Sequence, residues 1–199
     1  QRQMCIRDSS NSWGSEGEDS SDTEGNQALR DAVQYSQDKG KLFIAAAGNG
    51  RLDQGTMSQN GYDNDSDAKP SYPATYPHDS IISVSALDVN NQLGSFSNWG
   101  ARTVDIGAPG VKIFSTTVGS AYEDKVINLP QFKMVVFWDG TSMATPHVAG
   151  AAAAYWSKHP EKNWREVKDA LLSSATPISS LTGKVVSGGK LDLRKLMAQ

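Results

Sequence analysis

The run Gly140-Thr141-Ser142-Met143-Ala144-Thr145-Pro146-His147-Val148-Ala149-Gly150 decides how this chain folds. Gly140 permits a tight turn, and the small apolar residues after Ser142 are typical of a helix packed closely against other backbone. Pro146 agrees with a helix that begins near Ser142, because proline is tolerated in the first turn. There the hydroxyl of Ser142 is exposed, and its unpaired backbone N–H can stabilise an oxyanion. The run predicts a nucleophilic serine, with a plain N-cap serine as the alternative.

A second run, Leu42-Phe43-Ile44-Ala45-Ala46-Ala47-Gly48-Asn49-Gly50, is continuously apolar until it ends in Gly-Asn-Gly. Such a run suits a buried parallel strand that opens into a loop. Asn49 follows the carboxyl end of that strand, where sites gather in open α/β sheets. Its side-chain amide could donate to an oxyanion alongside the N–H of Ser142. An Asn-Gly pair also marks ordinary turns, and that interpretation stays open.

The rest of the chain alternates between helical and strand patterns. Apolar residues recur at helical spacing over 26–39, and Asn163 is placed to cap a helix that continues to residue 174. Apolar runs predict further strands over 81–86, 103–106 and 112–115, and a last helix is expected over 191–197. This alternation predicts an α/β fold of three layers, in which helices cover both faces of a mostly parallel sheet.

The composition is that of one globular domain. The chain has 199 residues and a net charge of −3, and no basic or aromatic cluster suggests a nucleic-acid partner. No segment is long and apolar enough to predict a membrane span. Cys5 is the one cysteine in the sequence, so neither a disulfide framework nor thiol chemistry is expected.

The first nine residues do not fit the rest of the chain. Gln1-Arg2-Gln3-Met4-Cys5-Ile6-Arg7-Asp8-Ser9 is too charged for the buried strand that should lead into Asn11-Ser12-Trp13-Gly14. We therefore expect a non-native join over residues 1–9 and exclude it from the predicted fold. The native chain is expected to occupy residues 10–199.

The runs around Ser142 and Asn49 resemble the subtilases, the subtilisin-like serine proteases. Further segments resemble the family in its order along the chain: Asn11-Ser12-Trp13-Gly14, Tyr72-Pro73-Ala74-Thr75-Tyr76, and Phe96-Ser97-Asn98-Trp99-Gly100 running on to Ala108-Pro109-Gly110. The resemblance implies a subtilisin-like fold and a secreted or extracellular serine endopeptidase that cleaves proteins or peptides. It allows a propeptide and requires no cofactor for the chemistry. It makes Ser142 the nucleophile and Asn49 the side-chain oxyanion donor.

The family's triad runs Asp, His, Ser along the chain, which places the first two members before Asn11. The chain has only His78, His147 and His159, and none lies in a block like the family's His-Gly-Thr-His. His147 follows Ser142 on the same predicted helix and is expected to point away from it. We therefore expect the carboxyl-terminal portion of a protease domain, truncated at the amino end, with little activity by itself.

The resemblance also implies where substrate binds. The walls of the primary pocket are expected to come from Ser12, Trp13, Gly14, Ala46, Ala47 and Gly48. Ser71 lies near the expected base of this pocket. No acidic residue is evident there, which argues against a strict preference for basic side chains. The acidic stretch 15–25 is expected to be a solvated loop.

A structural cation is a further implication of the resemblance. Backbone carbonyls at Ala74 and Tyr76, with the carboxylate of Asp105, are the expected ligands for calcium or sodium. Asp105 can equally be a loop carboxylate satisfied by neighbouring groups.

Two features depart from the family's pattern. The segment 118–138 is longer than the usual link before the serine, and its apolar run 134–138 predicts an extra strand or hairpin. Asp139 stands where an asparagine or serine often precedes Gly-Thr-Ser. Three alternatives remain: a non-catalytic subtilase homologue that binds peptides, a non-enzymatic α/β binding module, and a sedolisin-like serine-carboxyl peptidase. The last would carry an aspartate in place of Asn49.

Overall fold

The computed structural model describes residues 6–17, 24–56, 58–118, 121–129, 131 and 134–199. Across these residues the central sheet has six strands, in the order β1 (Asp8–Asn11), β3 (Leu42–Ala46), β7 (Ile81–Leu87), β8 (Ile106–Pro109), β14 (Gly189–Lys190) and β13 (Thr176–Pro177). Neighbouring strands pair in parallel except β13, which is antiparallel to β14. The prediction of a mostly parallel sheet is confirmed.

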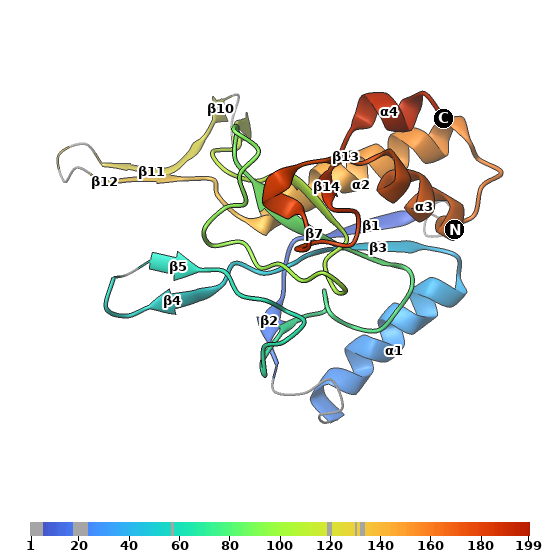
Figure 1. The fold of residues 1–199 in the computed structure, drawn as a ribbon, viewed down its shortest axis with the longest axis horizontal. Coiled ribbons are helices and arrows are strands. Elements are labelled where there is room, and N and C mark those ends of the chain that lie inside the picture. The colour runs from blue at the N-terminus through green and yellow to red at the C-terminus, as the bar shows by residue number, and fades with distance from the viewer. Residues whose placement is uncertain (1–5, 18–23, 57, 119–120, 130, 132–133) are drawn as a thin grey trace.

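Helices lie on both sides of this sheet, as expected (Figure 1). The helices are α1 (Glu24–Asp38), α2 (Thr141–Lys158), α3 (Trp164–Ser174), α4 (Leu193–Met197) and the short 3-10 helix Ser179–Leu181. In Figure 1, α1 lies below the sheet, whereas α2, α3 and α4 lie above it. The expected three-layer α/β arrangement is therefore the observed one.

Alternation along β3 explains how one strand supports both layers. Leu42 and Ile44 belong to the large apolar cluster that includes Val148 of α2. Phe43 and Ala45 belong to a second cluster with Val33 of α1. Because successive side chains of a strand point to opposite faces, a continuously apolar strand is what a sheet covered on both faces requires.

Among the described residues, four smaller antiparallel pairs lie outside the central sheet. They are β2 (Ser15–Glu16) with β6 (Ser71–Tyr72), β4 (Arg51–Asp53) with β5 (Ser58–Asn60), β9 (Ser115–Thr116) with β10 (Tyr122–Glu123), and β11 (Lys125–Leu129) with β12 (Met134–Phe137). The pair β11 and β12 projects from the body of the molecule (Figure 1). It lies within segment 118–138, so the hairpin expected there is confirmed.

The local predictions differ in accuracy. The expected cap of α3 is present: Asn163 Oδ1 accepts from the backbone N–H groups of Arg165 and Glu166, and the Glu166 carboxylate accepts from Asn163 N. The predicted strands 103–106 and 112–115 are displaced, because pairing begins only at residues 106 and 115. Lys112 adopts a φ of 54°, a left-handed conformation that interrupts an extended run there.

The first residues take part in the sheet to a greater extent than expected. Asp8 and Ser9 pair in parallel with Leu42 and Phe43, so their exclusion from the fold is corrected. A charged residue is tolerated because β1 lies at the edge of the sheet and Asp8 is only half-buried; that burial raises the pKa of its carboxyl. Residues 1–5 lie outside the described part, and the origin of segment 1–9 stays a prediction.

In the described part of the chain, no helix is both long and apolar enough to cross a membrane.

Candidate active site

Ser142 is the second residue of α2, where backbone N–H groups have no partner within the helix. Its hydroxyl Oγ donates to the backbone oxygen of Ser12 at 2.9 Å. In return, Ser12 Oγ donates to the backbone oxygen of Ser142 at 2.8 Å. These reciprocal bonds hold the loop after β1 against the beginning of α2, so the predicted nucleophile and the predicted substrate-binding segment are neighbours.

Asn49 lies beyond the carboxyl end of β3 and reaches the same helix terminus. Its Oδ1 accepts from the backbone N–H and from the hydroxyl of Thr141, each at 2.8 Å. The backbone N–H of Thr141 needs an acceptor, which fixes the orientation of the amide. The donor atom Nδ2 therefore turns toward Gly140, 3.3 Å from where a Cβ on that glycine would lie. Asn49 Nδ2 thus lies at the beginning of α2, and its role as an oxyanion donor stays a prediction.

A cavity of about 460 Å³ opens beside Ser142 and Asn49. Of the predicted pocket walls, Ser12, Trp13, Gly14, Ala46 and Gly48 line it. Ala47 does not line it, and this prediction is corrected. Its side chain packs in an apolar cluster with Leu87 and Val104, because neighbouring residues of an extended segment face opposite ways.

Two glycines allow the walls of this cavity to approach one another. A Cβ on Gly14 would lie 2.7 Å from the backbone oxygen of Tyr72. Gly48 has a φ of 111°, and a Cβ there would lie 2.9 Å from Ser71 Oγ. Side chains at these positions would collide with the opposite wall, so the cavity depends on both glycines.

Two buried asparagines, for which the sequence predicts no role, support the cavity, and Asn98 itself lines it. Asn98 Oδ1 accepts from the backbone N–H groups of Gly50 at 3.0 Å and Tyr62 at 3.2 Å. Asn98 Nδ2 donates to Asn64 Oδ1 at 3.1 Å, and Asn64 Nδ2 donates to the backbone oxygen of Ala47 at 2.9 Å. Asn98 lies in a quoted family segment, which is the signal that could have found it; no comparable signal marks Asn64.

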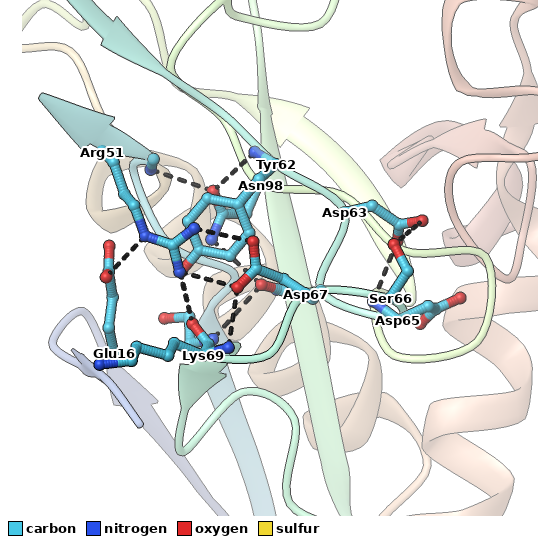
Figure 2. A network of polar contacts seen from close by, with 12 residues as sticks. Glu16, Arg51, Tyr62, Asp63, Asp65, Ser66, Asp67, Lys69 and Asn98 are labelled. Carbon is cyan, nitrogen blue, oxygen red and sulfur yellow. Dashed lines mark hydrogen bonds and ion pairs between the residues drawn. The ribbon is translucent and has the colours of Figure 1, made fainter. Parts of the chain in front are cut away.

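The expectation that no acidic residue faces the pocket is wrong, because Glu16 lines the cavity. Composition predicts that Glu16 lies in a solvated loop. In the structure it pairs with Ser71 across the β2 and β6 ladder, which brings the two side chains to one side. Its carboxylate accepts a hydrogen bond from Arg51 Nε at 2.8 Å (Figure 2).

None of the three histidines hydrogen-bonds to Ser142 within the described residues. The Nδ1 atom of His147 lies 2.9 Å from the backbone oxygen of Met143, to which it is placed to donate. His147 and Ser142 do share a second cavity of about 440 Å³. His159 lies against Tyr155, and burial lowers the pKa of His78. A general base for Ser142 is therefore not found among these side chains.

The residues expected to hold a cation line one pocket, but the carboxylate among them is paired with an ammonium group. Ala74, Tyr76 and Asp105 line one pocket with Lys168. Lys168 Nζ lies 3.2 Å from Asp105 Oδ1 and donates to the backbone oxygen of Ile81 at 2.5 Å. Burial raises the pKa of Asp105, and the charge of Lys168 opposes that rise. This arrangement does not fit a metal ion on the Asp105 carboxylate, and the calcium or sodium site stays a prediction.

Asp139, the residue that departs from the family's pattern, does not reach Ser142 through a hydrogen bond among the described residues. Its carboxylate accepts from the backbone N–H of Lys112 and so holds the turn at positive φ described above.

Comparison with known proteins agrees with this geometry. The family model described as "Subtilase family" matches residues 4–192. Subtilisin E of Bacillus subtilis (strain 168) is 41% identical over 152 residues, which are 76% of this chain and 33% of that protein. Subtilisin of Bacillus pumilus is 40% identical over 156 residues, which are 78% of this chain and 47% of that protein. The matched region thus spans less than half of these relatives.

Solved structures show the same fold. The prenylagaramide maturation protease PagA aligns with a TM-score of 0.68 and 27% identity, over 99% of this chain and 63% of that chain. The MycP3 protease of the type VII (ESX-3) secretion system aligns with a TM-score of 0.78 and 24% identity, over 98% of this chain and 54% of that chain.

Proposed function

This chain belongs to the subtilase family, and on that premise we propose that the protein carrying it hydrolyses peptide bonds through an acyl-enzyme on Ser142. The supporting observation is the meeting of two distant segments. The hydroxyl of Ser142 and the amide of Asn49 lie together at the beginning of α2, beside a cavity lined by the predicted substrate-binding segments. A serine, an oxyanion donor and a side-chain pocket are the parts that acyl transfer requires.

In the proposed reaction, a general base removes the proton from Ser142 Oγ as the oxygen attacks the peptide carbonyl. The tetrahedral oxyanion accepts hydrogen bonds from Asn49 Nδ2 and from the Ser142 N–H, and the leaving amine then takes the proton from the base. Water hydrolyses the acyl-enzyme by the same steps. Ser142 Oγ of this chain donates to the Ser12 carbonyl, so this bond must break when the base engages.

The base and its orienting carboxylate are proposed to come from chain outside these residues. The basis is that no histidine of the described residues hydrogen-bonds to Ser142, whereas activation of serine needs a neighbouring base. Residues 10–199 expressed alone are accordingly proposed to turn over very little peptide. A location outside the cell and a propeptide remain predictions that rest on the family resemblance.

Labelling with a fluorophosphonate tests the proposal directly. The protein expressed from its full gene should form a stoichiometric adduct, located at Ser142 by peptide mass mapping, and should lose its peptidase activity in step. Ser142→Ala should abolish both signals, whereas Ser58→Ala, an exposed serine on β5, should leave them unchanged. A folded protein that binds peptides, resists the probe and cleaves nothing would instead be a non-catalytic homologue.

A further inference from the structure

The cavity beside Ser142 contains one charged side chain among the described residues, that of Glu16. The side chain is 39% exposed, so its carboxylate is within reach of a group that enters from solvent. The β2 and β6 ladder sets Glu16 directly opposite Ser71, whose buried side chain also lines the cavity. A substrate side chain in this cavity therefore meets a carboxylate.

That carboxylate is already paired with Arg51, the first residue of β4 (Figure 2). Its Nε donates to Glu16 Oε2 at 2.8 Å. Its two terminal nitrogens donate to both oxygens of Asp67, at 2.7 and 2.8 Å, and Nη2 also donates to the backbone oxygen of Lys69 at 2.9 Å. The guanidinium lies over the ring of Tyr62, 4.1 Å from its centroid. Planar bidentate pairing and ring stacking of this kind fix a guanidinium in place.

This arrangement changes what the cavity offers to a charged substrate. A lysine or arginine side chain would approach a carboxylate already bound to a fixed positive charge, which offsets most of the attraction. An aspartate or glutamate side chain would bring further hydrogen-bond acceptors to the Glu16 carboxylate, which has no proton to donate. Asp67 does not line the cavity, and its bidentate pairing holds Arg51 in place. A neutral side chain meets neither penalty.

We propose that the Arg51 and Glu16 pair sets the specificity of this cavity, so that it admits neutral side chains and withholds Glu16 from lysine and arginine. The proposal rests on the proposed peptidase function. Glu16 is the residue that faces the substrate, and Arg51 is a positioning residue that acts through it. Substitution of Arg51 should raise the preference for basic side chains, while the residues that line the cavity stay the same.

The test compares two peptides that differ only at the residue on the acyl side of the cleaved bond, leucine or lysine. The protein expressed from its full gene should cleave the leucine peptide with a kcat/KM equal to or above that for lysine. Arg51→Gln should raise the lysine-to-leucine ratio of kcat/KM by about fivefold to tenfold, the effect of removing one nearby charge at a partly exposed site. Glu16→Gln together with Arg51→Gln should return the ratio to the parent value.

Controls separate specificity from folding and from activity itself. Both peptides are measured on the same variant, so a smaller folded fraction cancels in the ratio. Arg102→Gln removes an arginine that pairs with Asp65, away from the cavity, and should leave the ratio unchanged.

Three outcomes decide the question. The predicted rise in Arg51→Gln and its loss in the double variant support the proposal. An unchanged ratio in Arg51→Gln, or a parent enzyme that already prefers lysine by more than about tenfold, overturns it while the peptidase function stands. Failure to cleave either peptide, together with no labelling of Ser142, overturns the proposed function and this inference with it.

Discussion

Asn98→Ala should be among the most damaging polar substitutions in this fold. The Asn98 side chain is fully buried and makes three hydrogen bonds, from the backbone N–H groups of Gly50 and Tyr62 and to Asn64 Oδ1. Alanine removes all three and leaves the part-buried N–H groups of Gly50 and Tyr62 without this acceptor, whereas Asn64 Oδ1 keeps the N–H of Ser71. It also leaves a space in the wall of the substrate pocket, which Asn98 lines.

The size of the effect follows from those bonds. Each hydrogen bond contributes about 1 kcal/mol net, and a buried group left unsatisfied costs about 1–3 kcal/mol. The three hydrogen bonds belong to one local network, and water can enter the space left by the side chain. The total loss of stability is therefore smaller than the sum of the separate contributions. We expect the free energy of unfolding to fall by about 3–5 kcal/mol. Activity should fall as well, mainly through KM, because the cavity floor loses its support.

Urea unfolding of the parent and variant at neutral pH measures this change, from the shift in midpoint at constant slope. Asn60→Ala is the matched control, because Asn60 is exposed on β5, and it should stay within about 0.5 kcal/mol of the parent. A loss below about 1 kcal/mol for Asn98→Ala, with the slope unchanged, would refute the claim that this asparagine organises the cavity.

Three further predictions concern single contacts. Thr141→Val removes one of the two donors that orient Asn49 and should lower kcat about tenfold or more in a peptidase assay, with a smaller change in KM. Lys168→Met leaves the buried Asp105 carboxylate unpaired and should cost about 3 kcal/mol in urea unfolding at neutral pH, with a smaller loss near pH 4 where that carboxyl can protonate. A hydrogen bond from the Arg51 guanidinium holds the pKa of Asp67 below its ordinary 3.8. The contribution of Asp67 to stability is therefore present above that pH and is lost as the pH falls through the folded pKa. Asp67→Asn should flatten this fall in the free energy of unfolding at acid pH.

Each of these three substitutions has a control substitution that should leave the measured quantity unchanged. Thr182→Val changes an exposed threonine outside the cavity and should leave kcat unchanged. Lys195→Met and Asp169→Asn change exposed helical residues and should leave stability and its acid limb as in the parent. Equal effects in a variant and its counterpart would show that the named contact is not responsible.

Calcium addition and chelation provide a separate check on the Lys168 site. Because an ammonium group holds Asp105, the melting temperature of the parent should not respond to either treatment. A clear rise on adding calcium would restore the cation site expected at Ala74, Tyr76 and Asp105.

Features that depend on short stretches of chain can be predicted from the sequence alone. The helix after Gly140, the buried strand before Asn49 and the capped helix after Asn163 each follow from local spacing, turn residues and caps, which act over a few residues. The family resemblance then singled out Ser142 and Asn49, because their motifs are also local. Strand boundaries cannot be predicted in the same way. The strands predicted over 103–106 and 112–115 begin to pair only at residues 106 and 115, because an extended run does not show where its partner strand begins.

The surroundings of Ser142 and Asn49 depend on contacts between segments that are distant in the chain. Glu16 faces the cavity because its strand pairs with Ser71, and it is held by Arg51, a residue from a different hairpin. Asn98, which lines the cavity, meets Asn64 although 34 residues separate them, and Lys168 of α3 meets Asp105, which directly precedes β8. Composition predicts a solvated loop for Glu16, and the family resemblance predicts a metal ligand at Asp105, but neither shows which partner each carboxylate reaches. Those partners are fixed only when the sheet and its helices bring distant segments into contact.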